Sequence, residues 1–126
     1  FPYTTLFRSK PVPRQVMVFE VNGPMFFGAA DKIGQIPLDS DKKVLILRMR
    51  SVPAMDATAL NGLKKLNARC RKTRITMILS HVNEQPLSVM EKAGFDKEIG
   101  RENIAPRIDD AICRAGEILS EANAAD

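Results

Sequence analysis

The residues that could do chemistry are few, and they are scattered along the chain. The 126 residues include one histidine, His81, and two cysteines, Cys70 and Cys113, which form no CxxC pair and have no histidine beside them. A hydrolytic site needs a nucleophile, a base and a group that orients the base, and a zinc site needs three or four nitrogen or sulfur ligands. The sequence therefore predicts no catalytic set, no metal site and no enzyme. We expect both cysteines to be buried thiols in a reducing compartment.

Cofactor-binding motifs are also missing from the sequence. It contains neither the GxxxxGK[ST] loop that cradles phosphates nor the GxGxxG loop of dinucleotide-binding folds, and its seven glycines are mostly scattered singly. We expect no cofactor. His81 follows a predicted strand, a position more typical of a capped or surface residue than of a general base.

One short segment places an acid and a hydroxyl at the start of a helix. Asp56 and Thr58 directly follow the loop after an apolar strand and open a helical pattern. An aspartate there is typical of an N-cap, whose carboxylate accepts a backbone N–H. A phosphate on Thr58 would lie where the helix dipole and the unpaired N–H groups favour negative charge. The segment therefore has two compatible interpretations, a helix cap and a regulatory turn.

The same predicted helix has an apolar stripe of Ala59, Leu63, Leu66 and Cys70. Its basic residues fall mainly at the other positions. Such cations either form a solvated face or dock an acidic partner. The predicted docking residues are Lys64, Lys65, Arg69 and Lys72, with Arg71 nearby. The net charge of +4 does not predict nucleic-acid binding, because three cations lie in the first fourteen residues and the remainder is near neutral.

The apolar periodicity predicts an alternation of strands and helices, and hence an α/β fold. The most clearly predicted strand is 43–49, where Val44–Leu47 is apolar without alternation, as in a strand covered on both faces. We expect a mixed sheet of about four to five strands covered by about four helices. The other predicted strands are 16–21, 25–27 and 74–80, with an extended piece at 95–99, and the predicted helices are 28–36, 56–73, 83–93 and 104–122.

The chain is long enough for one domain. Residues 1–15 have no consistent period and contain three prolines, so we expect a linker or an added tail there, a domain at 16–122 and a C-terminal tail at 123–126. No run approaches the roughly 20 apolar residues that span a bilayer, and no secretory signal is present, so this chain is expected to be soluble.

Two segments resemble the STAS domain family, which includes the regulatory domains of sulfate transporters and the anti-sigma factor antagonists. Asp56-Ala57-Thr58-Ala59 is similar to the Asp-Ser-[Ser/Thr]-Gly turn of the family, with alanine where the antagonists commonly carry serine and glycine. The stretch GPMFFGAA at 23–30 resembles the Gly-Pro-Leu-Phe-Phe-Ala-Ala pattern of the transporter branch. The resemblance covers about residues 16–119.

This resemblance implies a non-catalytic regulatory and interaction domain of a bacterial SulP-type anion transporter of the sulfate, bicarbonate or dicarboxylate class. It implies a place on the cytoplasmic side of the inner membrane and a partner in the transporter's own membrane domain, against which Phe26 and Phe27 would pack unless they belong to the core. An acidic protein such as an acyl carrier protein and a homodimer through the full-length transporter are further expected partners. The alternative is an anti-sigma factor antagonist switched by phosphorylation at Thr58.

Overall fold

A four-stranded parallel sheet organises the chain. The computed structural model describes residues 6–7, 10–26 and 29–125. The strands β3 (Val16–Asn22), β4 (Val44–Ser51), β5 (Thr76–Ser80) and β6 (Ile104–Ala105) lie in that order across the sheet, and each neighbouring pair is parallel. Antiparallel pairing among the described strands occurs only between β1 (Leu6–Phe7) and β2 (Lys10–Pro11), which form a separate ladder. The predicted α/β class is thus confirmed, with a parallel sheet in place of a mixed one.

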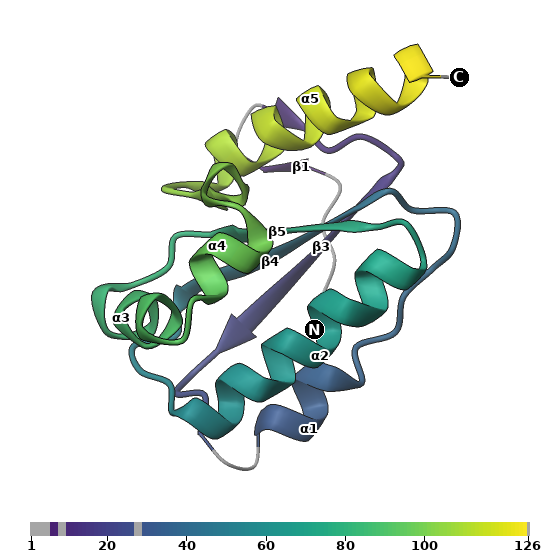
Figure 1. Cartoon of the computed structure of the whole chain (residues 1–126). Coiled ribbons are helices and arrows are strands. Elements are labelled where there is room, and N and C mark those ends of the chain that lie inside the picture. The colour runs from purple at the N-terminus through teal and green to yellow at the C-terminus, as the bar shows by residue number, and fades with distance from the viewer. Residues whose placement is uncertain (1–5, 8–9, 27–28, 126) are drawn as a thin grey trace.

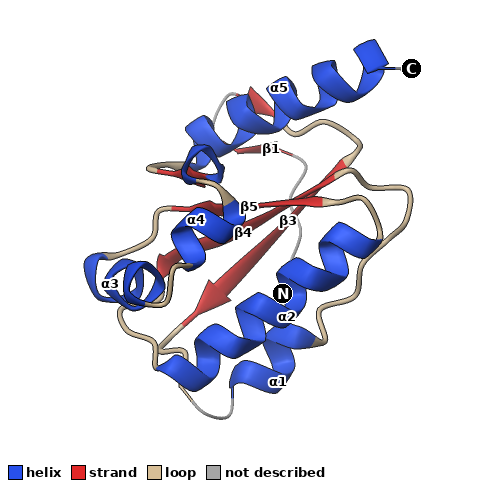
Figure 2. Ribbon diagram, viewed as in Figure 1, coloured by secondary structure: helices blue, strands red, loops and turns tan. Residues whose placement is uncertain are grey.

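Helices cover both faces of this sheet (Figures 1 and 2). On one side lie α1 (Ala29–Gly34), α2 (Ala57–Lys72), α3 (Glu84–Lys92) and α4 (Phe95–Ile99). On the other side α5 (Ile108–Ala125) runs across the strands. The turn η1 (Arg101–Asn103) leads from α4 into β6.

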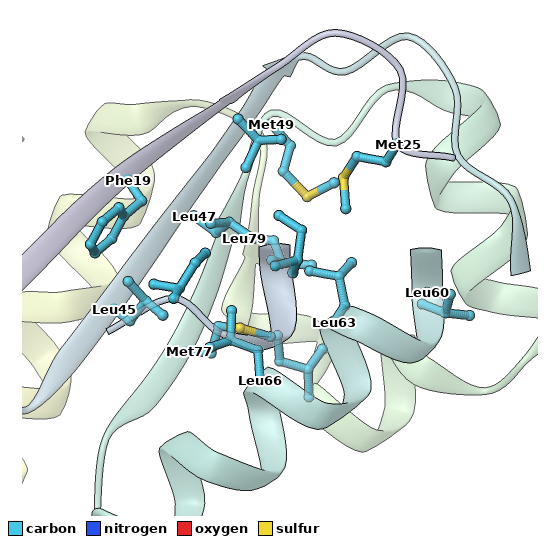
Figure 3. Packing of buried hydrophobic residues seen from close by; sticks show 14 of the residues in the cluster. Phe19, Met25, Leu45, Leu47, Met49, Leu60, Leu63, Leu66, Met77 and Leu79 are labelled. Carbon is cyan, nitrogen blue, oxygen red and sulfur yellow. The ribbon is translucent and has the colours of Figure 1, made fainter. Parts of the chain in front are cut away.

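β4 lies between β3 and β5 and alternates between two hydrophobic clusters. Leu45, Leu47 and Met49 pack under α2, whereas Val44 and Ile46 pack under α5. All five side chains are fully buried, which confirms the prediction made from the continuous apolar run. Figure 3 shows the first cluster, where β4 side chains and Met77 and Leu79 of β5 meet the apolar stripe of α2.

Three predicted elements differ from the structure, each for a local reason. Segment 95–99 is the helix α4, because Gly94 adopts the left-handed conformation (φ 74°) and lets the chain start a new helix at once. Phe95 and Ile99, four residues apart, then both point into the core. The last helix starts at Ile108, because residues 104–105 pair with β5. Met25 forms only an isolated bridge with Met55 in place of the predicted strand at 25–27, whose residue 27 lies outside the described residues.

Residues just before β3 already belong to the packed structure. The Gln15 carbonyl accepts the backbone N–H groups of Lys43 and Val44, at 2.8 and 3.2 Å, and so begins the pairing of β3 with β4. Val12 packs partly buried against the cluster under α5. These contacts place the start of the packed structure a few residues before β3.

We predict that removal of residues 1–10 changes the melting temperature by less than about 2 °C, because a two-residue ladder contributes little. Removal of residues 1–15 should lower it by about 5 °C or more, since it also deletes the Val12 and Gln15 contacts. Calorimetry on the two truncations checks this. Equal melting temperatures for the two would contradict it.

Candidate interaction site

The turn after β4 is built around Asp56. Its backbone is extended (φ −105°, ψ 174°), and a carboxylate oxygen accepts the Ala59 backbone N–H at 2.8 Å. The prediction that Asp56 is the N-cap of α2 is therefore confirmed. The first turn of α2 carries no acidic residue of its own, so this cap is the negative group closest to the positive end of the helix dipole.

Side chains at the start of α3 hold the same turn from one side. The Gln85 side-chain amide accepts the Met55 N–H at 2.8 Å and donates to the Met55 carbonyl at 3.1 Å. The Asn83 amide donates to the carbonyls of Val52 at 2.8 Å and Arg50 at 3.1 Å. Together, these two amides satisfy four backbone groups of the loop that leaves β4. No local sequence pattern indicates this pair of amide contacts, since Gln85 lies thirty residues from its partner.

The segment around Met25 holds the turn from the other side. Met25 donates its N–H to the Ala54 carbonyl at 2.9 Å and accepts the Asp56 N–H at 3.1 Å. Gly23, at φ 83°, makes the tight turn that brings this segment alongside and donates to the Ser51 carbonyl at 2.9 Å. Segments 23–26, 51–58 and 83–88 therefore meet at one end of the sheet.

The outer surface of this junction is exposed. Thr58 is exposed at the second position of α2, and Phe26 keeps 50% of its surface accessible, an unusual state for phenylalanine. An open groove of about 650 Å³ lies alongside, lined by Pro53, Asn83, Glu84, Gln85 and Ser88. Of the two predicted phenylalanines, Phe26 is at this surface and Phe27 lies outside the described residues. The junction pairs no nucleophile with a base, and it offers an apolar side chain, a hydroxyl and a helix N-terminus.

The predicted basic face of α2 separates into two groups. Lys65 and Lys72 are exposed and Lys64 is half-buried. Arg69, in contrast, donates through Nη1 to the carbonyls of Gly34 at 2.6 Å and Ile36 at 3.0 Å, at the C-terminal end of α1. Arg71 donates to the Glu98 carbonyl. The arginines therefore join α2 to α1 and α4, and the lysines form the part of the face for which no such hydrogen bond is seen among the described residues.

The cysteines differ from each other. Cys70 is buried, and that burial raises the pKa of its thiol to about 11, against a smaller opposing effect of the Arg69 charge. Cys113 is exposed, so the expectation that both are buried was wrong for it. Ile112 faces the sheet, which leaves the next position of α5 on the outer side. In the described part of the chain, no three acidic, histidine or cysteine side chains gather as metal ligands, and no helix has the length and apolarity to cross a membrane.

Comparison with known proteins identifies the family. The profile of the STAS domain matches residues 8–111. The chain belongs to the STAS domain family. The STAS fold of this chain superposes with a TM-score of 0.81 on a sulfate transporter family protein of Wolinella succinogenes, at 34% identity over 88% of this chain and 93% of that one. For the STAS domain of a Vibrio cholerae SulP transporter, the TM-score is 0.73 at 30% identity, over 90% and 88% of the two chains.

More distant relatives extend this picture. YvdB of Bacillus subtilis, named as a candidate sulfate transporter, is 28% identical over 91 residues, which are 70% of this STAS chain and only 17% of that relative. Mouse Slc26a9, an anion transporter, and a candidate anti-sigma factor antagonist of Thermotoga maritima share the fold, with TM-scores of 0.74 and 0.70 at 22% and 16% identity. The predicted relationship to the STAS domains of SulP transporters is confirmed.

We predict that Gln85→Ala lowers the free energy of unfolding by about 1 kcal/mol, because the Met55 N–H and carbonyl lose their shared partner. Hydrogen exchange of the Met55 amide should also become faster. Glu84→Asp, a change at the exposed neighbouring position that keeps the negative charge in the first turn of α3, is the matched control and should leave both quantities unchanged. Unchanged Met55 exchange in Gln85→Ala would show that the amide does not hold the turn.

We predict that Arg69→Met lowers the free energy of unfolding by about 1–2 kcal/mol, because it keeps the aliphatic stem and removes the guanidinium that binds the carbonyls of Gly34 and Ile36. Lys72→Met, at an exposed position of the same helix, should stay within about 0.5 kcal/mol of the wild type. Urea denaturation measures both. Equal effects of the two substitutions would mean that Arg69 is only part of a solvated face.

Proposed function

We propose that this chain is the cytoplasmic regulatory and interaction domain of a SulP-type secondary anion transporter, with no catalytic activity of its own. The observation that carries the proposal is the likeness at 34% and 30% identity, over nearly the full domain, to proteins named for sulfate transport and SulP transporters. The chain spans 17% of the length of YvdB, so the transport activity would belong to a longer protein that contains a domain of this kind. The transported anion would be sulfate, bicarbonate or a dicarboxylate.

The partner in this proposal is the membrane domain of the same transporter, at the cytoplasmic side of the inner membrane. The junction at Asp56 and Thr58 is its proposed docking surface, together with Phe26 and the undescribed Phe27. Two features support this choice: a half-exposed phenylalanine gains free energy when a partner covers it, and the backbone around it is already held by Met25 and Gln85. A rigid surface loses little conformational entropy on docking.

A second surface is proposed for an acidic protein such as an acyl carrier protein. It consists of the exposed or half-exposed lysines Lys64, Lys65 and Lys72. Arg69 was expected to belong to this surface, but its guanidinium is engaged by α1, which makes it a poor choice for a test of docking. A homodimer formed through the full-length transporter also remains a proposal.

Regulation through Thr58 is the final part of the proposal. Its hydroxyl is exposed at a helix N-terminus whose first turn contains no acid, so a phosphoryl group would be favoured there by the helix dipole. The anti-sigma factor antagonist alternative shares this chemistry. It rests on a likeness of 16% identity, which shows the fold alone, and so the transporter role is preferred.

Uptake by the full-length transporter tests the proposal. Thr58→Glu should change the rate of anion uptake at least about twofold, since it places a charge at the docking surface, whereas Thr58→Ala should resemble the wild type. The isolated Thr58→Glu domain should stay folded, because the dipole favours the charge by about 0.3–1 kcal/mol. Asn61→Glu, exposed one turn further along α2, is the matched control for added charge. Equal uptake in Thr58→Glu and wild-type transporters of equal abundance would contradict a regulatory turn.

A further inference from the structure

A basic pocket lies at the C-terminal end of the sheet, on the face covered by α5. Its volume is about 420 Å³, and it is lined by Arg48 and Arg50 of β4, His81 after β5, and Arg107 and Ile108 at the start of α5. Alternate residues of a strand share a face, so Arg48 continues the row of Val44 and Ile46 that packs under α5, and Arg50 lines the same pocket. The pocket therefore begins where that hydrophobic cluster ends.

The lining is suited to an anion. Three of its five residues are arginines, drawn from two separate elements, and none of the five is acidic. Arg107 lies at the cap position of α5, since its carbonyl accepts the Ala111 N–H, and the first N–H groups of that helix have no acceptor within the helix. Guanidinium groups and helix N-termini both favour oxyanions, and arginine forms two parallel hydrogen bonds to a carboxylate or phosphate.

A buried hydroxyl adds an independent observation. Ser80 is 0% exposed, and its Oγ has no hydrogen-bond partner among the described residues. It is the register partner of Arg48 on β5 and precedes His81, so it lies on the same face of the sheet as Arg48 and next to two residues that line the pocket. An unpaired buried hydroxyl is costly, and an oxyanion in the pocket would give it an acceptor.

Acidic groups border the pocket without lining it. Glu20 of β3 is the register partner of Arg48, and Asp109 and Asp110 lie in the first turn of α5. Arg48 is half-buried and has an interaction within the fold. Arg50 and Arg107 are exposed, and so the two of them carry most of the charge that a ligand would meet.

We propose that this pocket binds a tetrahedral oxyanion, either as free sulfate or phosphate or as the phosphoryl group of a larger molecule. Arg50 and Arg107 would hold the oxygens, with Arg48 beside them and the Ser80 hydroxyl buried behind Arg48. The pocket also lies next to the interaction site, because the carbonyl of Arg50 accepts the Asn83 amide that holds the turn after β4. The proposal does not depend on the transporter role, since the isolated chain is sufficient to test it.

The sole histidine of the chain provides the measurement. In proton NMR spectra, its imidazole C–H resonances need no assignment by mutation, because the chain has one histidine. Since His81 lines the pocket, these resonances respond to a ligand bound there. Titration of the chain with sodium sulfate or sodium phosphate, at fixed pH and with ionic strength held constant by chloride, should shift these resonances to saturation. A linear, unsaturated shift, or the same curve when chloride replaces sulfate, would overturn the proposal.

Variants locate the site. Arg50→Gln and Arg107→Gln, measured as single variants, should each weaken the apparent affinity about fivefold or more, because each arginine supplies charge-assisted hydrogen bonds. Arg74→Gln is the matched control: this exposed arginine precedes β5, at the opposite end of the sheet, and should change the affinity less than about twofold. An equal effect of Arg74→Gln would mean that only the net charge matters and would overturn the site.

A final arm identifies the source of the anion. Glycerol phosphate and inorganic phosphate are titrated in parallel, and the His81 imidazole resonances measure the binding of each. Tighter binding of glycerol phosphate indicates a phosphoryl group carried on a larger molecule, and equal or weaker binding indicates the free ion. Saturable binding of neither compound, with none for sulfate, overturns the proposal in both forms. Melting temperatures of the variants without ligand confirm that each is folded.

Discussion

The burial of β4 on both faces is the constraint on which the rest of the structure depends. Val44, Leu45, Ile46 and Leu47 are all 0% exposed, so helices must cover both sides of the sheet, and parallel neighbours must satisfy the backbone on both edges of the strand. Parallel pairing brings the carboxyl ends of β3, β4 and β5 to the same edge. The turn at Asp56 and the basic pocket both lie at this edge, whereas the lysines of α2 extend away from it.

The two sites at this edge differ in how they are held. The turn at Asp56 is fixed by backbone hydrogen bonds from Met25 and by the side-chain amides of Asn83 and Gln85, so its shape is set before any partner arrives. The pocket on the α5 side is lined by long, mostly exposed basic side chains, whose order would come from a ligand. The first arrangement suits recognition of a surface, and the second suits capture of a small charged group.

The sequence predicted the features that depend on neighbouring residues. The apolar run of β4, the stripe of α2 and the Asp56 cap are readable because strand burial, helix periodicity and capping act over a few positions. Features that depend on distant segments were not predictable. Examples are the hydrogen bonds of Gln85 to Met55 and of Arg69 to the end of α1. Another is the pocket that Arg50, His81 and Arg107 line together. The helix α4 was missed because the conformation of Gly94 permits either a stop or a restart, and only the burial of Phe95 and Ile99 decides between them.

The contacts of Arg69 with the end of α1 bear on the local stability of that helix. A helix of six residues does not persist alone in water, so α1 exists because its buried Ile33 packs in the core and one guanidinium holds its final carbonyls. Short segments held by few contacts are typical of the units of a fold that unfold locally before its central strands do. Met25 is hydrogen-bonded to the turn at Asp56, so local unfolding of α1 would leave that part of the proposed docking surface in place while the central strands keep their pairing.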